Sequence, residues 1–537
     1  MNYKEIGINI LILTIIFLFQ FLTLWPKISK TSALLARDSY YWTRQILYLD
    51  EDGIVNYSEL GSLYPWGFIL FCGGNLLISN DFITTYYFMK LACFPFLNFY
   101  ILVMFSISKR IFKKKVLIFF CLISILSQMF FMYRTLMFLS SSIAVLLILI
   151  SLIILLTETP NYFLCFIIPA IFLFNPVYDF YFILALTIFY IIKLINLNRN
   201  RILIYKEIIA ISSLSIILVS PYVISAFFFY GKDLISLIDS FSRFFEIKNF
   251  SQSNTIIEIP SNFQLKLFLL NLFYIELYEI QFLLYIGFIF LLPIWSFFLK
   301  VETQDDRRKD FIIFLKVGFI LTIFILLTPF FFSTIRFFKN YFIRILEAFI
   351  PFLILLSGLF FEQVLSKAEK LWGNTKLKFK KVKKWAEKNK FNKNILNLPL
   401  LLIILMLVLS LFAYDYSRIH TGTRYYYDDS LVKCCFYINE NIEENTNIAV
   451  YDFNESSIHS SAIYYLLYRY DLIYYRFNGN VTLNDFWAFL QANTIEILII
   501  NLLYYTQDFI DDFSSNSSFN TLVGGLTNGE FSLYQIL

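Results

Sequence analysis

A single aspartate, Asp38, stands in a short polar stretch near the start of a long loop between two apolar runs. The loop, 26–85, continues with aromatic residues and an amphipathic run. A carboxylate at the boundary of lipid and water can accept a proton from a hydroxyl, or hold a divalent cation such as Mg²⁺ or Mn²⁺. Loops of this length are usually functional. The alternative is a solvated loop in which Arg37 and Asp38 form a surface pair.

Three cations, Arg336, Lys339 and Arg344, precede another apolar run, and Arg336 and Lys339 share one face of a helix. They suit a phosphate at the membrane surface, because arginine binds it as a fork and lysine as a point charge. They suit lipid head groups equally well. Arg134, in another loop, is a further candidate for the phosphate. Glu347 follows inside the apolar run, either as a functional acid or as a partner of Arg344.

The amino-acid composition indicates that the segments that carry these residues lie in a lipid membrane. Of the 537 residues, 58% are hydrophobic and 15% are charged, against roughly 45–50% and 25% in soluble proteins. A soluble globule, a disordered chain and a disulfide scaffold are thereby excluded. The only histidines, His420 and His459, lie near the C-terminus, which excludes histidine chemistry from the apolar part.

Eleven apolar runs predict a polytopic α-helical membrane protein with about eleven transmembrane helices. The runs are 1–25, 86–108, 116–132, 138–157, 161–175, 177–195, 207–229, 281–299, 311–332, 341–361 and 395–414. The stretch 65–79 is apolar but short and rich in glycine, so it predicts an interfacial or re-entrant helix rather than a crossing.

The distribution of lysine and arginine predicts the orientation. With a cytoplasmic N-terminus, the basic loops fall on the cytoplasmic side; these are 109–115, 193–206, 300–309 and the lysine-rich loop 362–394. That last loop has apolar residues between its lysines, which favours contact with anionic lipid over nucleic acid. We therefore expect a multi-pass protein of the plasma membrane, with residues 1–414 as the membrane domain and 415–537 outside the cytoplasm.

Residues 415–537 alternate between helical and strand patterns, which predicts a C-terminal extracytoplasmic α/β domain. Such alternation favours a parallel sheet with covering helices. The expected helices are 429–442, 457–468 and 483–493, and the expected strands are 447–452, 472–475 and 496–501.

The loop 26–85 resembles the first outer loop of GT-C glycosyltransferases, of the archaeal type related to oligosaccharyltransferase catalytic subunits and dolichyl-phosphate-sugar transferases. The sequence R-D-S-Y-Y-W-T-R at 37–44, followed by L-Y-P-W-G-F at 63–68, is similar to the family pattern D-x-Y-x-x-x-R and then Y-P-x-G. The resemblance implies a GT-C-like fold with Asp38 as the essential acid. Its neighbours in the two motifs are Tyr40, Tyr41, Arg44 and Tyr64.

The resemblance implies a membrane glycosyltransferase that moves a sugar from a polyprenyl- or dolichyl-phosphate carrier to an acceptor on the outer face. Asp38 would act as the base and the sugar would be inverted. Arg344 matches the arginine that contacts the donor phosphate in the family, with Arg336 and Lys339 beside it. The acceptor is a lipid, a glycan or a protein, and no nucleic acid takes part.

The sequence departs from the family at two points. The second outer turn, 131–137, has no acid, so Asp179 is the best available second carboxylate if a metal ion binds with Asp38. The Trp-Trp-Asp-Tyr-Gly motif of oligosaccharyltransferases is absent. Two alternatives are a non-catalytic transporter or flippase of lipid-linked sugars, and an inactive GT-C-like subunit. Spans nearly free of charge, with no internal repeat, disfavour the transporter.

Overall fold

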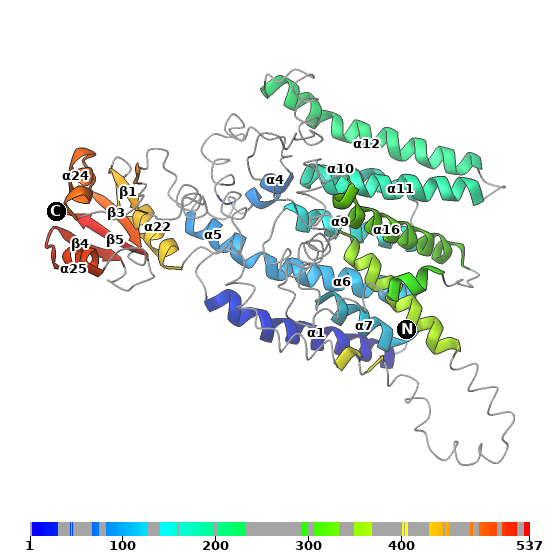
Figure 1. The fold of residues 1–537 in the computed structure, drawn as a ribbon. Helices are drawn as coiled ribbons and strands as arrows, with labels where there is room; N and C mark the ends of the chain where they lie inside the picture. The colour runs from blue at the N-terminus through cyan, green and yellow to red at the C-terminus, as the bar shows by residue number, and fades with distance from the viewer. Residues whose placement is uncertain are drawn as a thin grey trace, which may run out of the picture. The chain divides into compact units, whose positions relative to one another are not determined.

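The computed structural model describes part of the 537-residue chain in two compact units (Figure 1). The helical unit comprises Met1–Phe19, Asn56–Phe68 and Cys93–Tyr414, and the α/β unit comprises Gln20–Val55, Ile69–Ala92 and Asp415–Leu537. The described residues are 3–30, 43, 46, 67–74, 82–126, 140–157, 161–196, 201–230, 292–298, 305–331, 348–367, 400–401, 403–405, 429–443, 446–451, 473–475, 483–501, 507–523 and 531–537.

Helices form over most of the predicted spans. They are α1 (Tyr3–Lys30), α6 (Cys93–Ile111), α7 (Lys115–Leu126), α9 (Ser140–Leu156), α10 (Leu164–Phe174), α11 (Pro176–Asn196), α12 (Arg201–Tyr230), α16 (Asp306–Phe331) and a helix over Ala348–Lys367. A short 3₁₀ helix, η2 (Asn161–Phe163), leads into α10. In the described part, four segments are long and apolar enough to cross a membrane, and several shorter apolar helices accompany them. The number eleven stays a prediction.

The position of each helix follows from how its apolar residues are distributed. Helix α9 is apolar on all sides, and such a helix must be buried; it packs against α6, α10, α11 and α16. Helix α12 packs along α10, and its outward side chains Ile202 and Ile216 are 72% and 70% exposed. Figure 1 shows α12 at the edge of this group of helices. In a membrane protein, such an exposed apolar face is the one that contacts lipid.

The turn between α10 and α11 is set by the dipeptide Asn175-Pro176. A residue before proline is held extended, and Asn175 has φ −158° and ψ 101°. Its side-chain oxygen accepts hydrogen bonds from the backbone N–H groups of Val177 at 3.2 Å and Tyr178 at 3.5 Å. Asparagine thereby caps α11 while proline occupies the first helical position, where it needs no donor. This turn fixes Asp179 in the first turn of α11.

The stretch predicted to be an interfacial or re-entrant helix forms α4 (Gly67–Gly73), which is too short to cross a membrane. Its first residue, Gly67, lies directly on the C-terminal end of α10. A Cβ atom on Gly67 would come within 2.6 Å of the backbone oxygen of Leu173. The glycine of the Y-P-x-G motif is therefore required by close packing beside the turn at Asn175.

Replacing Gly67 with alanine should destabilise the helical unit. The new methyl group would meet backbone and not a movable side-chain end, so the two segments must separate. Overpacking of this kind costs about 1–3 kcal/mol, which thermal unfolding in detergent would show as a lower midpoint. The control is Gly7→Ala in α1, where nothing lies within 4 Å of the added Cβ and no loss is expected. Equal midpoints for both variants would contradict the close packing.

The tail forms a five-stranded sheet with strand order β2-β1-β3-β5-β4. The strands are β1 (Ile448–Tyr451), β2 (Ile473–Tyr475), β3 (Ile497–Asn501), β4 (Phe519–Val523) and β5 (Phe531–Ile536). Strands β1, β2 and β3 are parallel, as expected, whereas β5 runs antiparallel to both β3 and β4. The prediction of a parallel sheet is therefore corrected to a mixed one. The last two strands follow each other without a long crossover, so they pair antiparallel.

Helices cover both faces of this sheet. One face packs against α5 (Phe82–Leu91) and α22 (Asp429–Asn441), and the other packs against α24 (Leu483–Ala492) and α25 (Gln507–Ser515). Alternate residues of each strand supply the two cores, as strand geometry requires; Ile499 faces the first and Leu498 the second. Helices α22 and α24 were predicted, α25 was not, and the helix expected at 457–468 lies outside the described residues.

Helix α5 contributes one aromatic residue to the first of these cores. Tyr86 is fully buried and meets Phe436 of α22 edge to face, with ring centroids 4.8 Å apart. The adjacent cysteines Cys434 and Cys435 lie in the same core as free thiols. Burial raises the pKa of the Cys435 thiol, so it packs as a small apolar side chain.

Candidate functional site

Most of the predicted site residues lie outside the described part of the chain. These are Asp38, Tyr40, Tyr41, Arg44, Tyr64, Arg134, Arg336, Lys339 and Arg344. Within the same loop, the helical residues Thr43 and Ile46 are described, and both are buried. Their spacing of three residues puts them on one face of a helical turn. The roles predicted for the undescribed residues remain predictions.

Asp179 is the one predicted site residue that the structure describes. It lies in the first turn of α11, and its backbone N–H donates to the carbonyl of Asn175 at 3.2 Å. Its side chain is only 4% exposed, and Oδ1 has no hydrogen-bond partner among the described residues. Buried charged groups are normally paired. An unpaired carboxylate on a predicted membrane span is therefore a candidate for function.

Asp179 shares the buried face of α11 with large aromatic residues. Phe182 and Phe189 both meet Phe314 of α16 edge to face, with ring centroids 6.2 and 5.5 Å apart. By contrast, Phe180, on the other side of α11, is 53% exposed. The carboxylate therefore belongs to the interior of the helical unit and not to the surface that meets lipid.

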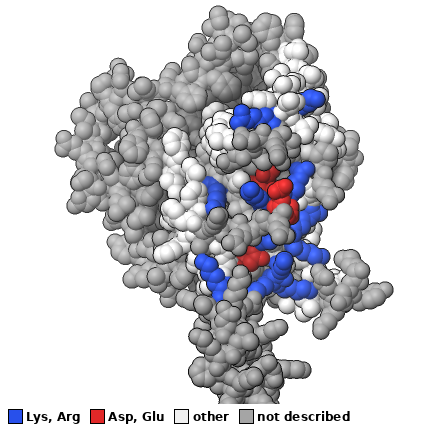
Figure 2. All heavy atoms as spheres, turned by 90° about the vertical axis from the view of Figure 1, so that its right-hand side faces the viewer, with Lys and Arg blue, Asp and Glu red and all other residues white. Residues whose placement is uncertain are grey.

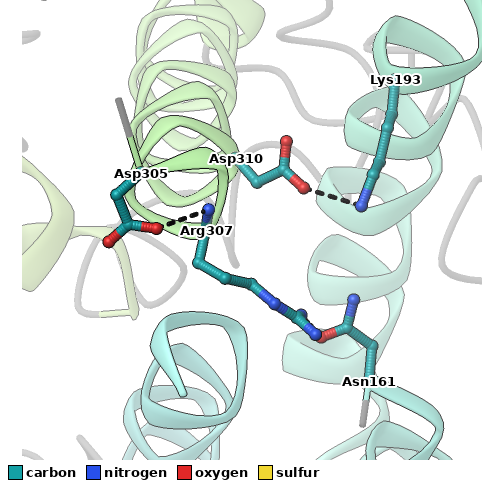
Figure 3. Close-up of polar contacts among 5 residues, drawn as sticks. All are labelled: Asn161, Lys193, Asp305, Arg307 and Asp310. Carbon is teal, nitrogen blue, oxygen red and sulfur yellow. Dashed lines mark hydrogen bonds and ion pairs between the residues drawn. The ribbon is translucent and has the colours of Figure 1, made fainter. Parts of the chain in front are cut away.

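A polar cluster lies at the opposite end of α11, which we call the charged end (Figure 3). Lys193 forms an ion pair of 2.7 Å with Asp310 of α16. Arg307 of α16 donates to the side chain of Asn161 in η2 at 3.0 Å. The backbone N–H of Arg307 donates in turn to the carboxylate of Asp305 at 3.0 Å, which caps α16. These contacts join α11, α16 and η2 to one another.

The charged end has a second ion pair and a basic surface. Arg308 of α16 and Glu362 of the helix over Ala348–Lys367 pair at 2.5 Å. Figure 2 shows lysine and arginine side chains gathered on this end, with a smaller number of acidic ones among them. Loops 193–206 and 300–309, both predicted on the cytoplasmic side, thus contribute to one cluster. The side of the membrane on which this end lies stays a prediction.

The contacts of the charged end are structural in kind. Lys193, Arg307 and Arg308 each have a carboxylate or amide partner from another element, so these contacts hold helix ends in register. In the sequence, these charges indicate only an orientation. The pairing of Lys193 with Asp310 joins residues far apart in the chain, and no local pattern indicates it.

A metal site is not formed by the residues that the structure describes. Among them, no group of three histidine, cysteine, aspartate or glutamate side chains is close enough to hold an ion. One carboxylate, Asp179, does not supply the several oxygen ligands that Mg²⁺ or Mn²⁺ requires. A cation shared with Asp38 therefore stays a prediction.

No protein-family model and no curated protein matches the sequence. Solved structures do match. The chain is similar to ArnT from Cupriavidus metallidurans bound to undecaprenyl phosphate, with a TM-score of 0.56, 11% identity and 98% of each chain covered. It is also similar to the apo state of that protein, with a TM-score of 0.50, 11% identity, and 99% of this chain and 98% of the other covered.

The likeness shows the fold over nearly the whole chain. This protein has an ArnT-like fold, and the described part of the chain contains four helices long and apolar enough to cross a membrane. The motif residues of the first outer loop before Gly67 lie outside the described part of the chain, apart from Thr43, so the GT-C resemblance of that loop stays a prediction. The relation to archaeal and oligosaccharyltransferase members stays a prediction.

Proposed function

We propose that the protein is a membrane glycosyltransferase that takes a sugar from a polyprenyl-phosphate carrier. The observation that carries the proposal is the fold shared with ArnT over 98% of both chains, in a structure of ArnT that holds undecaprenyl phosphate. The motif around Asp38 and the close packing of Gly67 support it independently. Undecaprenyl phosphate and dolichyl phosphate present the same phosphate and isoprenoid chemistry.

In the proposed reaction, the carboxylate of Asp38 takes the proton of the acceptor hydroxyl as its oxygen attacks the anomeric carbon. The bond from that carbon to the phosphate oxygen breaks, the configuration inverts, and the polyprenyl phosphate leaves with the bonding electrons. Positive charge near that phosphate stabilises the transition state. The residues proposed to supply it are Arg344, Arg336, Lys339 and Arg134.

The proposal places the reaction on the outer face of the plasma membrane, opposite the charged end. Tyr40, Tyr41, Arg44 and Tyr64 would surround Asp38 in the first outer loop. The N-terminus and the basic loop 362–394 would be cytoplasmic, and residues 415–537 would lie outside. Basic charge on the end that carries Lys193 and Arg308 supports this orientation.

The test is sugar transfer by the purified full-length chain in lipid nanodiscs. Undecaprenyl phosphates that carry radiolabelled hexoses or pentoses serve as donors, and a membrane lipid and glycan extract serves as acceptor. We expect label to leave at least one donor and undecaprenyl phosphate to accumulate in equal amount. The same sugars as nucleotide esters should give no transfer. Binding of these lipids without transfer or release of phosphate would instead favour an inactive subunit or a transporter.

A further inference from the structure

Asp179 combines three properties that no structural role in the described residues explains. It carries a carboxylate, it is more than nine-tenths buried, and its Oδ1 has no hydrogen-bond partner in the part of the chain that the structure describes. At the other end of α11, Lys193 is paired with Asp310. Among the described residues, this helix therefore carries a paired charge at one end and a buried acid without a partner at the other.

The surroundings of Asp179 place it beside the first outer loop. Gly67, from the second motif of that loop, lies on Leu173, and Leu173 is separated from Asp179 only by the capped turn at Asn175. Asp179 is the fourth residue of α11, so it lies in the first turn, near the end of a predicted span. This position suits the sugar of a polyprenyl-linked donor, because the lipid chain remains in the membrane while the sugar lies near its surface.

We propose that Asp179 binds a hydroxyl group of the substrate sugar. A sugar hydroxyl supplies the O–H donor that Oδ1 lacks among the described residues. The hydroxyl comes from the donor sugar or from a sugar acceptor, and the chemistry is the same. Asp179 is thus a binding residue that orients the sugar, distinct from the base Asp38. The inference rests on the proposed function.

The experiment compares the unmodified chain with Asp179→Leu, which keeps the branched shape of the side chain and removes both acceptor oxygens. Both are placed in nanodiscs and titrated with undecaprenyl phosphate, and with the undecaprenyl-phosphate sugar that the unmodified chain transfers best. For a donor hydroxyl, we expect affinity for the sugar-bearing lipid to fall about tenfold or more. Affinity for undecaprenyl phosphate should not change. For an acceptor hydroxyl, donor affinity should stay constant while kcat/KM for the acceptor falls by a similar factor.

The matched control is Tyr190→Phe. Tyr190 lies on the same helix, is 6% exposed, and also carries a polar group in the interior of the helical unit. It stands eleven residues from Asp179, about 16 Å along the axis, towards the charged end. Transfer and both affinities should be unchanged in this variant. A difference between sugar-bearing and bare lipid is a readout that a purely structural role of Asp179 would not produce.

Unchanged sugar affinity and unchanged transfer in Asp179→Leu would overturn the proposal. Where that variant fails to fold, Asp179→Glu replaces it: the charge stays and the reach changes, so a folded variant with lowered sugar affinity supports the role and one with full affinity refutes it. If the unmodified chain transfers no sugar from any donor, the proposed function fails, and this inference falls with it. Failure of the proposed function is thus distinguished from failure of this inference, because only the former removes transfer by the unmodified chain.

Discussion

Sugar transfer should be abolished in Asp38→Asn, with folding and donor binding close to those of the unmodified chain. Asparagine matches aspartate in volume but cannot accept the proton of the acceptor hydroxyl. Loss of a positioned base typically lowers the rate by ~10²–10⁴. Single-turnover transfer from a labelled undecaprenyl-phosphate sugar measures the rate directly, and titration with undecaprenyl phosphate measures binding separately.

A second carboxylate of the same loop provides the control for Asp38. Asp52 lies fourteen residues further along and outside both motifs, so Asp52→Asn should retain the full transfer rate. The comparison separates loss of one catalytic group from loss of negative charge in the loop. Wild-type turnover in purified Asp38→Asn would show that Asp38 is only a surface residue, as in a solvated loop with an Arg37–Asp38 pair.

Binding of the donor should weaken in Arg344→Gln, the variant with the second largest expected effect. A hydrogen bond to a charged group contributes roughly 1.5–3 kcal/mol, which corresponds to about 10–150-fold in affinity for the polyprenyl phosphate. Affinity for the acceptor should change much less. Arg344→Lys should recover only part of the loss, because lysine lacks the planar fork that binds two phosphate oxygens.

The competing role for Arg344 is an ion pair with Glu347, three residues later in the sequence. The double variant Arg344→Gln with Glu347→Gln distinguishes the two roles. If the pair is structural, the double variant should regain thermal stability lost in the single one, and it should still bind undecaprenyl phosphate weakly. Restored lipid binding in the double variant would rule out contact between Arg344 and the phosphate.

The outcome for the tail illustrates what local patterns predict well. Strands β1, β2 and β3 and helices α22 and α24 were each expected within a residue or two of their bounds, since short apolar runs between polar turns indicate them. Strands β4 and β5 were missed. Phe519–Val523 is only partly buried at the edge of the sheet, so its sequence lacks the continuous apolar run of a central strand.

For the candidate site, the sequence predicted which types of residue take part but not how they are arranged. An acidic residue is visible in any sequence, and Asp179 was noted as the best available second carboxylate for a metal ion. Whether Asp179 has a hydrogen-bond partner depends on the helices packed around it, and no spacing of residues along the chain indicates that. The same holds for Gly67, whose motif was noted, while its requirement for close packing on Leu173 is visible only in the assembled helices.

The sequence by itself predicted a polytopic membrane protein, because apolar runs of spanning length are stable only in lipid. It also predicted an orientation in the membrane, the α/β character of the tail and the GT-C resemblance. Tertiary structure alone decided which charges are paired. Lys193 meets Asp310 and Arg308 meets Glu362 because the helices bring distant segments together, whereas Asp179 is left buried without a partner among the described residues.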